Sequence, residues 1–280
     1  MHASAPFELA ILVGAVGAGV LGALMGLGGG VLIIPMLTAM GVDIRHAIAA
    51  SIVAVIATSC AAASSYVRDG LANIRIGIFL CVATTTGALL GAGLNGLLPV
   101  RALFLIFAAV LGWSGVVMFR KRGRPVTRLE PAEDAPGGRL RLAGRFYDPS
   151  LARERRYAPK RPALGFGLMV GAGTVSGLLG IGSGALKVPA MDVAMDLPIK
   201  VSTATSNFMI GITGLASALV YLQRGQVLVS LVAPIALGVL GGATVGTRIL
   251  PKVAASTIRS WFVVVLAVIV GQMLYKGVVG

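Results

Sequence analysis

Charged side chains are scarce in this sequence, and the groups on which most enzymes depend are scarcer still. Only 12% of the 280 residues are Asp, Glu, Lys or Arg, whereas soluble domains carry about 25%. The two histidines, His2 and His46, and the two cysteines, Cys60 and Cys81, lack the spacing of a metal site or a catalytic triad. We therefore expect no enzyme activity, no metal and no other cofactor.

Long apolar runs fill most of the chain instead. Apolar residues make up 56% of the sequence, and its mean hydropathy is +0.91. Several runs approach the ~20 residues that an α-helix needs to cross a bilayer core, and they lack the alternation of a membrane β-strand. The composition predicts an all-α polytopic membrane protein surrounded by lipid.

Positive charge is concentrated in one segment between apolar runs, residues 120–161. This segment holds 13 of the 24 Lys and Arg residues but 5 of the 10 Asp and Glu residues. Basic loops are typical of the cytoplasmic face, so we predict a cytoplasmic, partly disordered linker rather than a nucleic-acid-binding segment. It separates a first transmembrane repeat, residues 1–119, from a second, residues 162–280.

Two apolar segments are interrupted by glycine at matching places. They read GLGGGVLIIP at 26–35 and GIGSGALKVP at 180–189. Glycine and proline disfavour an uninterrupted helix, and irregular backbone in a membrane is tolerated only where protein or water satisfies it. As one helix, residues 7–40 would measure about 50 Å, well beyond a ~30 Å core. We therefore expect two broken or re-entrant hairpins.

Further short motifs recur in the same order in both halves. Ala50-Ser51 aligns with Ala204-Thr205, and Tyr66–Gly70 aligns with Tyr221–Gly225. We therefore predict two homologous repeats, each with a broken hairpin and three spans. The predicted spans are residues 47–66, 76–97 and 102–119, then 203–222, 227–249 and 258–276.

The relative direction of the repeats depends on what the chain does at each break. If it folds back, each repeat has three crossings and the repeats are inverted; if it passes through, each has four and they are parallel. With the linker in the cytoplasm, folding back places four basic residues of the second half inside and two outside, and full crossing reverses this. The positive-inside rule therefore favours inverted repeats. The four are Lys200, Arg248, Lys252 and Arg259, and the two are Arg224 and Lys276.

The breaks and the polar residues after them are candidates for binding a small anion. A helix that restarts after a break directs N–H groups and the positive end of its dipole at an oxyanion. Alternatively, the glycines only permit close packing, and the hydroxyls only join helices. The candidates are Gly28, Gly29, Gly30, Ser51, Gly182, Ser183, Gly184, Thr205, Ser206 and Asn207, the last three within a polar run over 202–207.

Lys187 is the most informative single candidate, because the first repeat has Ile33 at its position. A cation inside the membrane is costly unless it has a partner or a task. Lys187 therefore attracts an anionic substrate, forms an internal pair with Asp192 or Asp196, or extends to the membrane interface. These two carboxylates are also the candidates for ion pairing or ion coupling in the second half.

The two glycine motifs, the duplicated halves and the basic central segment resemble the sulfite exporter TauE/SafE family, also called TSUP. The resemblance covers nearly the whole chain except residues 120–161. It implies a multi-pass permease of the bacterial inner membrane. The resemblance implies that its substrates are small sulfur-containing anions, such as sulfite or organosulfonates. We expect export by alternating access between the two repeats, and import with a coupling ion stays open. Ser183 and Lys187 depart from the family pattern.

Two other functional classes stay open at this point. A membrane enzyme acting on lipid phosphates would need carboxylate or histidine chemistry at the breaks. A non-transporting scaffold would act through the basic segment. The sequence determines neither the substrate nor the oligomeric state.

Overall fold

The computed structural model describes residues 5–95, 97–121, 142–148 and 153–279. Within these residues, eight helices are long and apolar enough to cross a membrane, so the predicted all-α polytopic membrane fold is confirmed. The long helices are α1 (Ala5–Met25), α3 (Ile44–Arg68), α4 (Ile74–Asn95), α5 (Val100–Lys121), α7 (Pro162–Leu179), α9 (Ile199–Gln223), α10 (Val229–Ile249) and α11 (Ala255–Val279).

Local chemistry explains where several helices begin, and these positions lie outside the predicted spans. The carboxylate of Asp43 accepts the backbone N–H of Arg45 (2.8 Å), which caps α3 three residues before the predicted start at 47. Pro162 opens α7, where a missing N–H costs nothing. Polar caps and prolines thus set helix ends that hydropathy alone places too far inside.

The first glycine motif separates α1 from a short helix, α2 (Gly30–Ala39). The chain reverses there: a methyl group built on Gly14 of α1 would overlap the sulfur of Met36 of α2, and one on Gly22 would overlap Gly29. The second motif separates α7 from α8 (Gly184–Pro189), which continues into a π-helical turn, η1 (Ala190–Ala194).

The return of the chain after the second break is equally tight. Lys160 at the start of α7 donates its N–H to the carbonyl of Met195, just after η1 (2.9 Å). The side chain of Met195 fills the space beside Gly165 of α7. Both broken segments are therefore helical hairpins in this structure.

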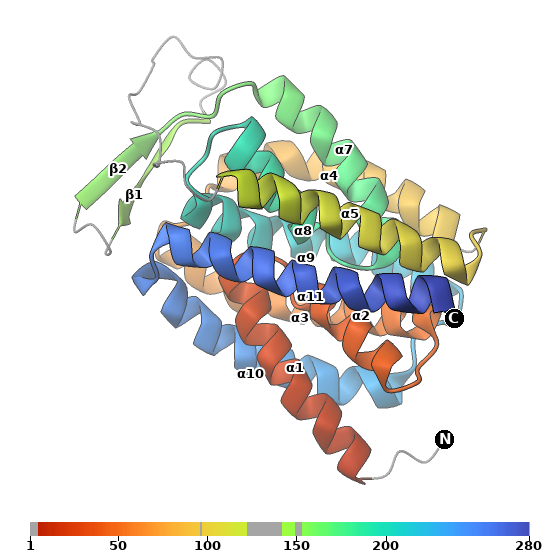
Figure 1. The fold of residues 1–280 in the computed structure, drawn as a ribbon. Helices are drawn as coiled ribbons and strands as arrows, with labels where there is room; N and C mark the ends of the chain where they lie inside the picture. Colours follow the sequence, from red (N-terminus) through yellow and green to blue (C-terminus); the bar gives the residue numbers. More distant parts are fainter. Residues whose placement is uncertain (1–4, 96, 122–141, 149–152, 280) are drawn as a thin grey trace.

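The long helices pair across the two halves of the chain. α1 packs on α10, α4 on α7, and α3 on α9 near the centre, while α5 lies beside α11 (Figure 1). Glycine allows the closest approaches: a methyl group on Gly91 would overlap the carbonyl oxygen of Thr174, and one on Gly242 that of Val16. The two halves thus share one helical body with small residues at its contacts.

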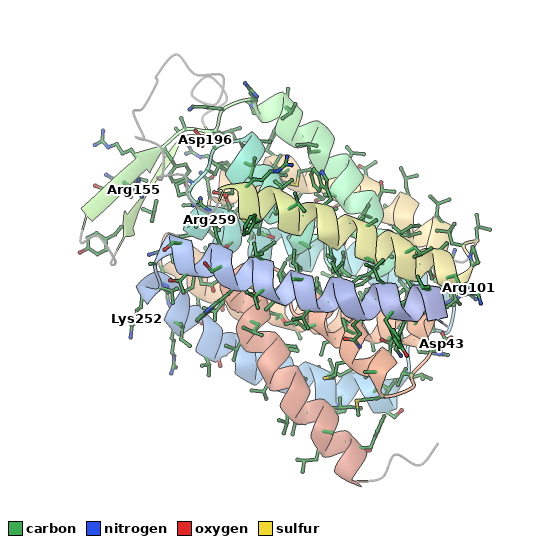
Figure 2. The ribbon with its side chains drawn as sticks, in the orientation of Figure 1. Asp43, Arg101, Arg155, Asp196, Lys252 and Arg259 are labelled. Atoms are coloured by element: carbon green, nitrogen blue, oxygen red, sulfur yellow. The ribbon has the colours of Figure 1, made fainter. Side chains whose placement is uncertain are left out.

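Charged residues gather at the two ends of this body. Figure 2 shows Arg155, Asp196, Lys252 and Arg259 at the end that carries the segment between the halves, and Asp43 and Arg101 at the opposite end. At the latter end, Arg224 donates to the carbonyls of Ala92 and Gly93, and Lys276 donates to that of Thr38.

The linker contains an antiparallel hairpin, β1 (Gly144–Asp148) and β2 (Arg153–Tyr157), which the sequence analysis does not predict. Its buried face presents Phe146 and Tyr157 to the helices. Asn73, in the loop after α3, donates to the hydroxyl of Tyr157 (3.0 Å) and to the carbonyl of Leu142 (3.1 Å). Partial disorder is predicted for the linker 120–161 as a whole, of which residues 122–141 and 149–152 lie outside the described residues.

Candidate functional site

The two glycine breaks have positive φ values at the same three aligned positions. Gly26, Gly28 and Gly29 have φ values of 71°, 75° and 71°, and their aligned partners Gly180, Gly182 and Ser183 have 66°, 68° and 56°. This left-handed region is costly for a residue with a Cβ, so Ser183 is held there by its surroundings. It is buried, and its hydroxyl donates to the carbonyl of Gly182 (2.7 Å).

The breaks touch each other in the interior of the protein. A methyl group on Gly184 would overlap the carbonyl oxygen of Gly26, and one on Gly30 would lie 3.3 Å from that of Gly180. Gly28 and Gly182 both face Val55 of α3 and Ile210 of α9. The structure therefore brings together the six predicted residues of the breaks, although they come from segments about 154 positions apart.

Two serines join the breaks across the halves. Ser51 of α3 donates to the carbonyl of Gly180 (2.7 Å), and Ser206 of α9 donates to that of Gly26 (2.9 Å). Each hydroxyl satisfies a carbonyl at the end of a broken helix. The counterpart of Ser51 is therefore Ser206, so the predicted alignment of Ser51 with Thr205 is wrong by one residue.

Thr205 faces a different neighbour. Its hydroxyl oxygen accepts the backbone N–H of Asn73 (3.0 Å), the residue that also holds the β-hairpin. Thr205 thus links the start of α9 to the loop after α3, and the structure does not place it between the breaks. Sequence reasoning misses Asn73, because a single Asn in a loop carries no distinguishing pattern.

Lys187 of α8 is fully buried. Its ammonium donates to the hydroxyl of Thr213 on α9 (2.9 Å) and approaches the carbonyl of Gly182 (3.4 Å). Thr213 lies in turn 3.3 Å from the hydroxyl of Thr84 on α4. Three helices therefore contribute to the surroundings of this cation, and no pattern in the sequence indicates that Thr84 and Thr213 join it.

The alternative of an internal pair between Lys187 and Asp192 or Asp196 is not what the structure contains. Asp192 pairs with Arg259 of α11 (2.9 Å), and both side chains are buried. Asp196 pairs with Lys160 (2.8 Å) near the protein surface. Both carboxylates pair with residues at the end of the bundle that carries the hairpin, whereas the ammonium of Lys187 lies beside the break.

Asn207, the last predicted site residue, is buried on α9 beside the end of α1. Its amide nitrogen donates to the carbonyls of Ala23 (3.0 Å) and Thr203 (3.1 Å), whereas its amide oxygen is buried without a partner among the described residues. The buried hydroxyls of Ser202 and Thr203, one turn earlier on α9, also have no hydrogen-bond partner among the described residues.

The chemistry of this central region is that of binding. Within the described residues, no group of three or more His, Cys, Asp and Glu side chains could hold a metal ion. The breaks offer carbonyls, hydroxyls, an amide and one ammonium, which can hold a small ligand by hydrogen bonds and charge.

Such a centre within eight apolar helices is typical of membrane transporters, in which broken helices meet near a substrate site. The family model of the sulfite exporter TauE/SafE matches residues 10–273. The chain belongs to the sulfite exporter TauE/SafE family, as its glycine motifs predict.

Curated relatives that match most of the chain are described as probable membrane transporter proteins. The probable membrane transporter protein YunE of Bacillus subtilis is 27% identical, and the match covers 97% of this chain and 98% of the relative. The probable membrane transporter protein YdhB of the same organism is 25% identical over 88% and 89% of the two chains, respectively. A probable membrane transporter protein of Xylella fastidiosa is 26% identical, over 83% of this chain and 81% of the relative.

No solved structure matches the chain significantly. The protein is a multi-pass membrane transporter for a small molecule.

Proposed function

We propose that this transporter carries small sulfur-containing anions, such as sulfite or organosulfonates, out of the bacterial cytoplasm across the inner membrane. The observation that carries the proposal is Lys187, a buried cation whose close polar contacts are a hydroxyl and a carbonyl. An anion bound beside it would offset the cost of a charge in the membrane. Export would also follow the inside-negative potential, which is worth about 2.3 kcal/mol per charge per 100 mV.

The substrate would bind where the two breaks meet, on the side of Lys187. Thr213 and Thr84 continue the polar surface there, and Ser183 lies at the break itself.

Alternating access between inverted repeats is the mechanism that we propose. The matched φ values of the breaks, the reciprocal bonds of Ser51 and Ser206, and the reversal of the chain at both breaks support two repeats related by a pseudo-two-fold axis. Movement of one repeat against the other would expose the breaks first to one side and then to the other.

Transport by the purified protein in proteoliposomes tests the proposed substrate. We expect movement of radiolabelled sulfite, competed by an organosulfonate. Lys187→Met should raise KM for sulfite about tenfold, which corresponds to about 1.4 kcal/mol. Lys252→Met, which removes an exposed ammonium at one end of the protein, is the matched control and should transport normally. Unchanged sulfite kinetics in Lys187→Met would remove Lys187 from the site.

Sidedness requires a separate experiment. We propose that residues 120–161, with Lys200 and Lys252, face the cytoplasm, and that Arg224 and Lys276 face the opposite side, because this arrangement follows the positive-inside rule. A reporter fused after Lys276 should report the non-cytoplasmic side, and one inserted between residues 125 and 136 the cytoplasmic side. A cytoplasmic signal from Lys276 would refute the inverted arrangement.

A further inference from the structure

Three buried polar oxygens on α9 have no hydrogen-bond partner among the described residues. They are the hydroxyls of Ser202 and Thr203 and the amide oxygen of Asn207, and all three residues are 0% exposed. A buried polar group without a partner costs roughly 1–3 kcal/mol. Three such groups within two turns of one helix therefore require an explanation.

These side chains lie on two adjacent strips of α9, and each strip includes a residue that contacts the end of α1. Residues three or four positions apart lie on the same side of a helix. Ser206, one turn after Ser202, reaches the carbonyl of Gly26, and Asn207, one turn after Thr203, reaches that of Ala23. The backbone of Thr203 itself lies against Gly26.

The first half of the chain supplies an internal comparison. Ile48 contacts Gly180 as Thr203 contacts Gly26, and the pairs Ser51 with Ser206 and Val55 with Ile210 keep the same offset of 155. The positions equivalent to Ser202, Thr203 and Asn207 are therefore Ala47, Ile48 and Ile52, which are buried and apolar. Packing against a glycine break thus requires no polar group at these positions.

The chemistry of this cluster favours a cation over an anion. The amide of Asn207 is oriented by two carbonyls that accept from its nitrogen, so its free atom is the oxygen, which cannot donate to an oxyanion. The cluster also faces the C-terminal end of α1, the negative end of the helix dipole. In broken-helix transporters, helix C-termini and unwound carbonyls are where Na⁺ or H⁺ is held.

We propose that Ser202, Thr203 and Asn207, with the end of α1 at Gly26, form a binding site for a small monovalent cation, Na⁺ in the first instance. The donors are neutral oxygens, and the described residues contain no cluster of acidic, His or Cys side chains that would select a divalent or transition metal. The two breaks then differ in character, because the second has the amine of Lys187 beside it and the first would bind a free cation.

A role of this cation in driving transport rests on the proposed function, but its binding does not. The test is therefore equilibrium binding of radioactive ²²Na⁺ to the purified full-length protein in nanodiscs, in a gluconate buffer without sulfite. We expect saturable binding that unlabelled Na⁺ displaces and choline does not. The double variant Ser202→Ala/Thr203→Val, which imitates the apolar equivalents in the first half, should bind Na⁺ about tenfold more weakly.

Two further variants separate binding from folding. Ser217→Ala removes another buried hydroxyl of α9, one that donates to the carbonyl of Thr213 in its own helix, and should bind Na⁺ like the wild type. Thr203→Ser keeps the hydroxyl and should also retain binding. If the double variant does not fold, Na⁺-dependent thermal stabilisation in Thr203→Val and Thr203→Ser provides the comparison, and only the serine variant should keep it.

Three results would overturn the inference. They are no saturable Na⁺ binding by the wild type, equal Na⁺ binding by the hydroxyl-free variants, and a loss of sulfite binding with Na⁺ binding intact, which would assign the hydroxyls to the anion. By contrast, saturable Na⁺ binding in a protein that does not transport sulfite would retain the cation site and reject only the proposed substrate.

Discussion

Asp192 and Arg259 form a buried ion pair that joins the π-helical turn after α8 to the first turns of α11. Two nitrogens of the guanidinium donate to the two carboxylate oxygens, at 2.9 and 3.3 Å. This geometry ties the second glycine hairpin to the last helix of the bundle. Because both side chains are buried, each one neutralises the charge of the other.

Removing one member of this pair should therefore be severe. We expect Asp192→Asn to lower the free energy of unfolding by about 3–5 kcal/mol, because it leaves the Arg259 charge buried. Asp196→Asn breaks a more exposed pair with Lys160 and should cost about 1 kcal/mol or less. Thermal unfolding in detergent measures both, and equal losses would contradict the buried pair.

The serine bonds between the breaks should contribute equally on the two sides. Ser51→Ala and Ser206→Ala each remove a hydroxyl that satisfies a buried carbonyl, so each should cost about 1–3 kcal/mol. Ser64→Ala removes an exposed hydroxyl of α3 and serves as the control. Thermal unfolding compares the three variants, and a harmless Ser206→Ala would argue against equivalent caps.

The contact between the breaks leaves no room for a side chain. In Gly184→Ala, the added methyl group would overlap the backbone of Gly26, and the chain must shift to relieve it. We expect a loss of about 1–3 kcal/mol of stability together with loss of transport. The methyl group of Gly241→Ala on α10 meets no described atom within 4 Å, so this variant should behave as wild type. Transport assays and thermal unfolding distinguish the two variants.

Tyr157, in the β-hairpin of the linker, has a raised pKa. Burial raises the pKa of the Tyr157 hydroxyl from 10.0 to about 12. The folded state therefore binds this proton more tightly than the unfolded state, so the docked hairpin keeps its stability below about pH 10 and loses it as the pH rises toward about 12. Tyrosinate absorbance of wild type minus Tyr157→Phe should show a step near pH 12, and a step near pH 10 would show that Tyr157 is accessible to solvent.

Much of the architecture follows from the sequence because it depends on composition and local pattern. Apolar run lengths predict the membrane-spanning helices, and the glycine motifs at 26–35 and 180–189 predict where two of them break. The helix ends are less predictable, since caps such as Asp43 are single residues whose effect depends on the adjoining backbone.

The sequence by itself therefore determined that this is a helical membrane transporter of the TauE/SafE family with two glycine breaks. The tertiary structure alone decided which residues meet at them. It places the ammonium of Lys187 beside the hydroxyl of Thr213 and pairs Asp192 with Arg259. It also makes Ser206 the counterpart of Ser51. It also left Ser202, Thr203 and Asn207 with oxygens unpaired among the described residues, and ordered a hairpin in the linker. The physical reason is that such partners lie on other helices, and their proximity depends on how whole helices pack rather than on any local pattern.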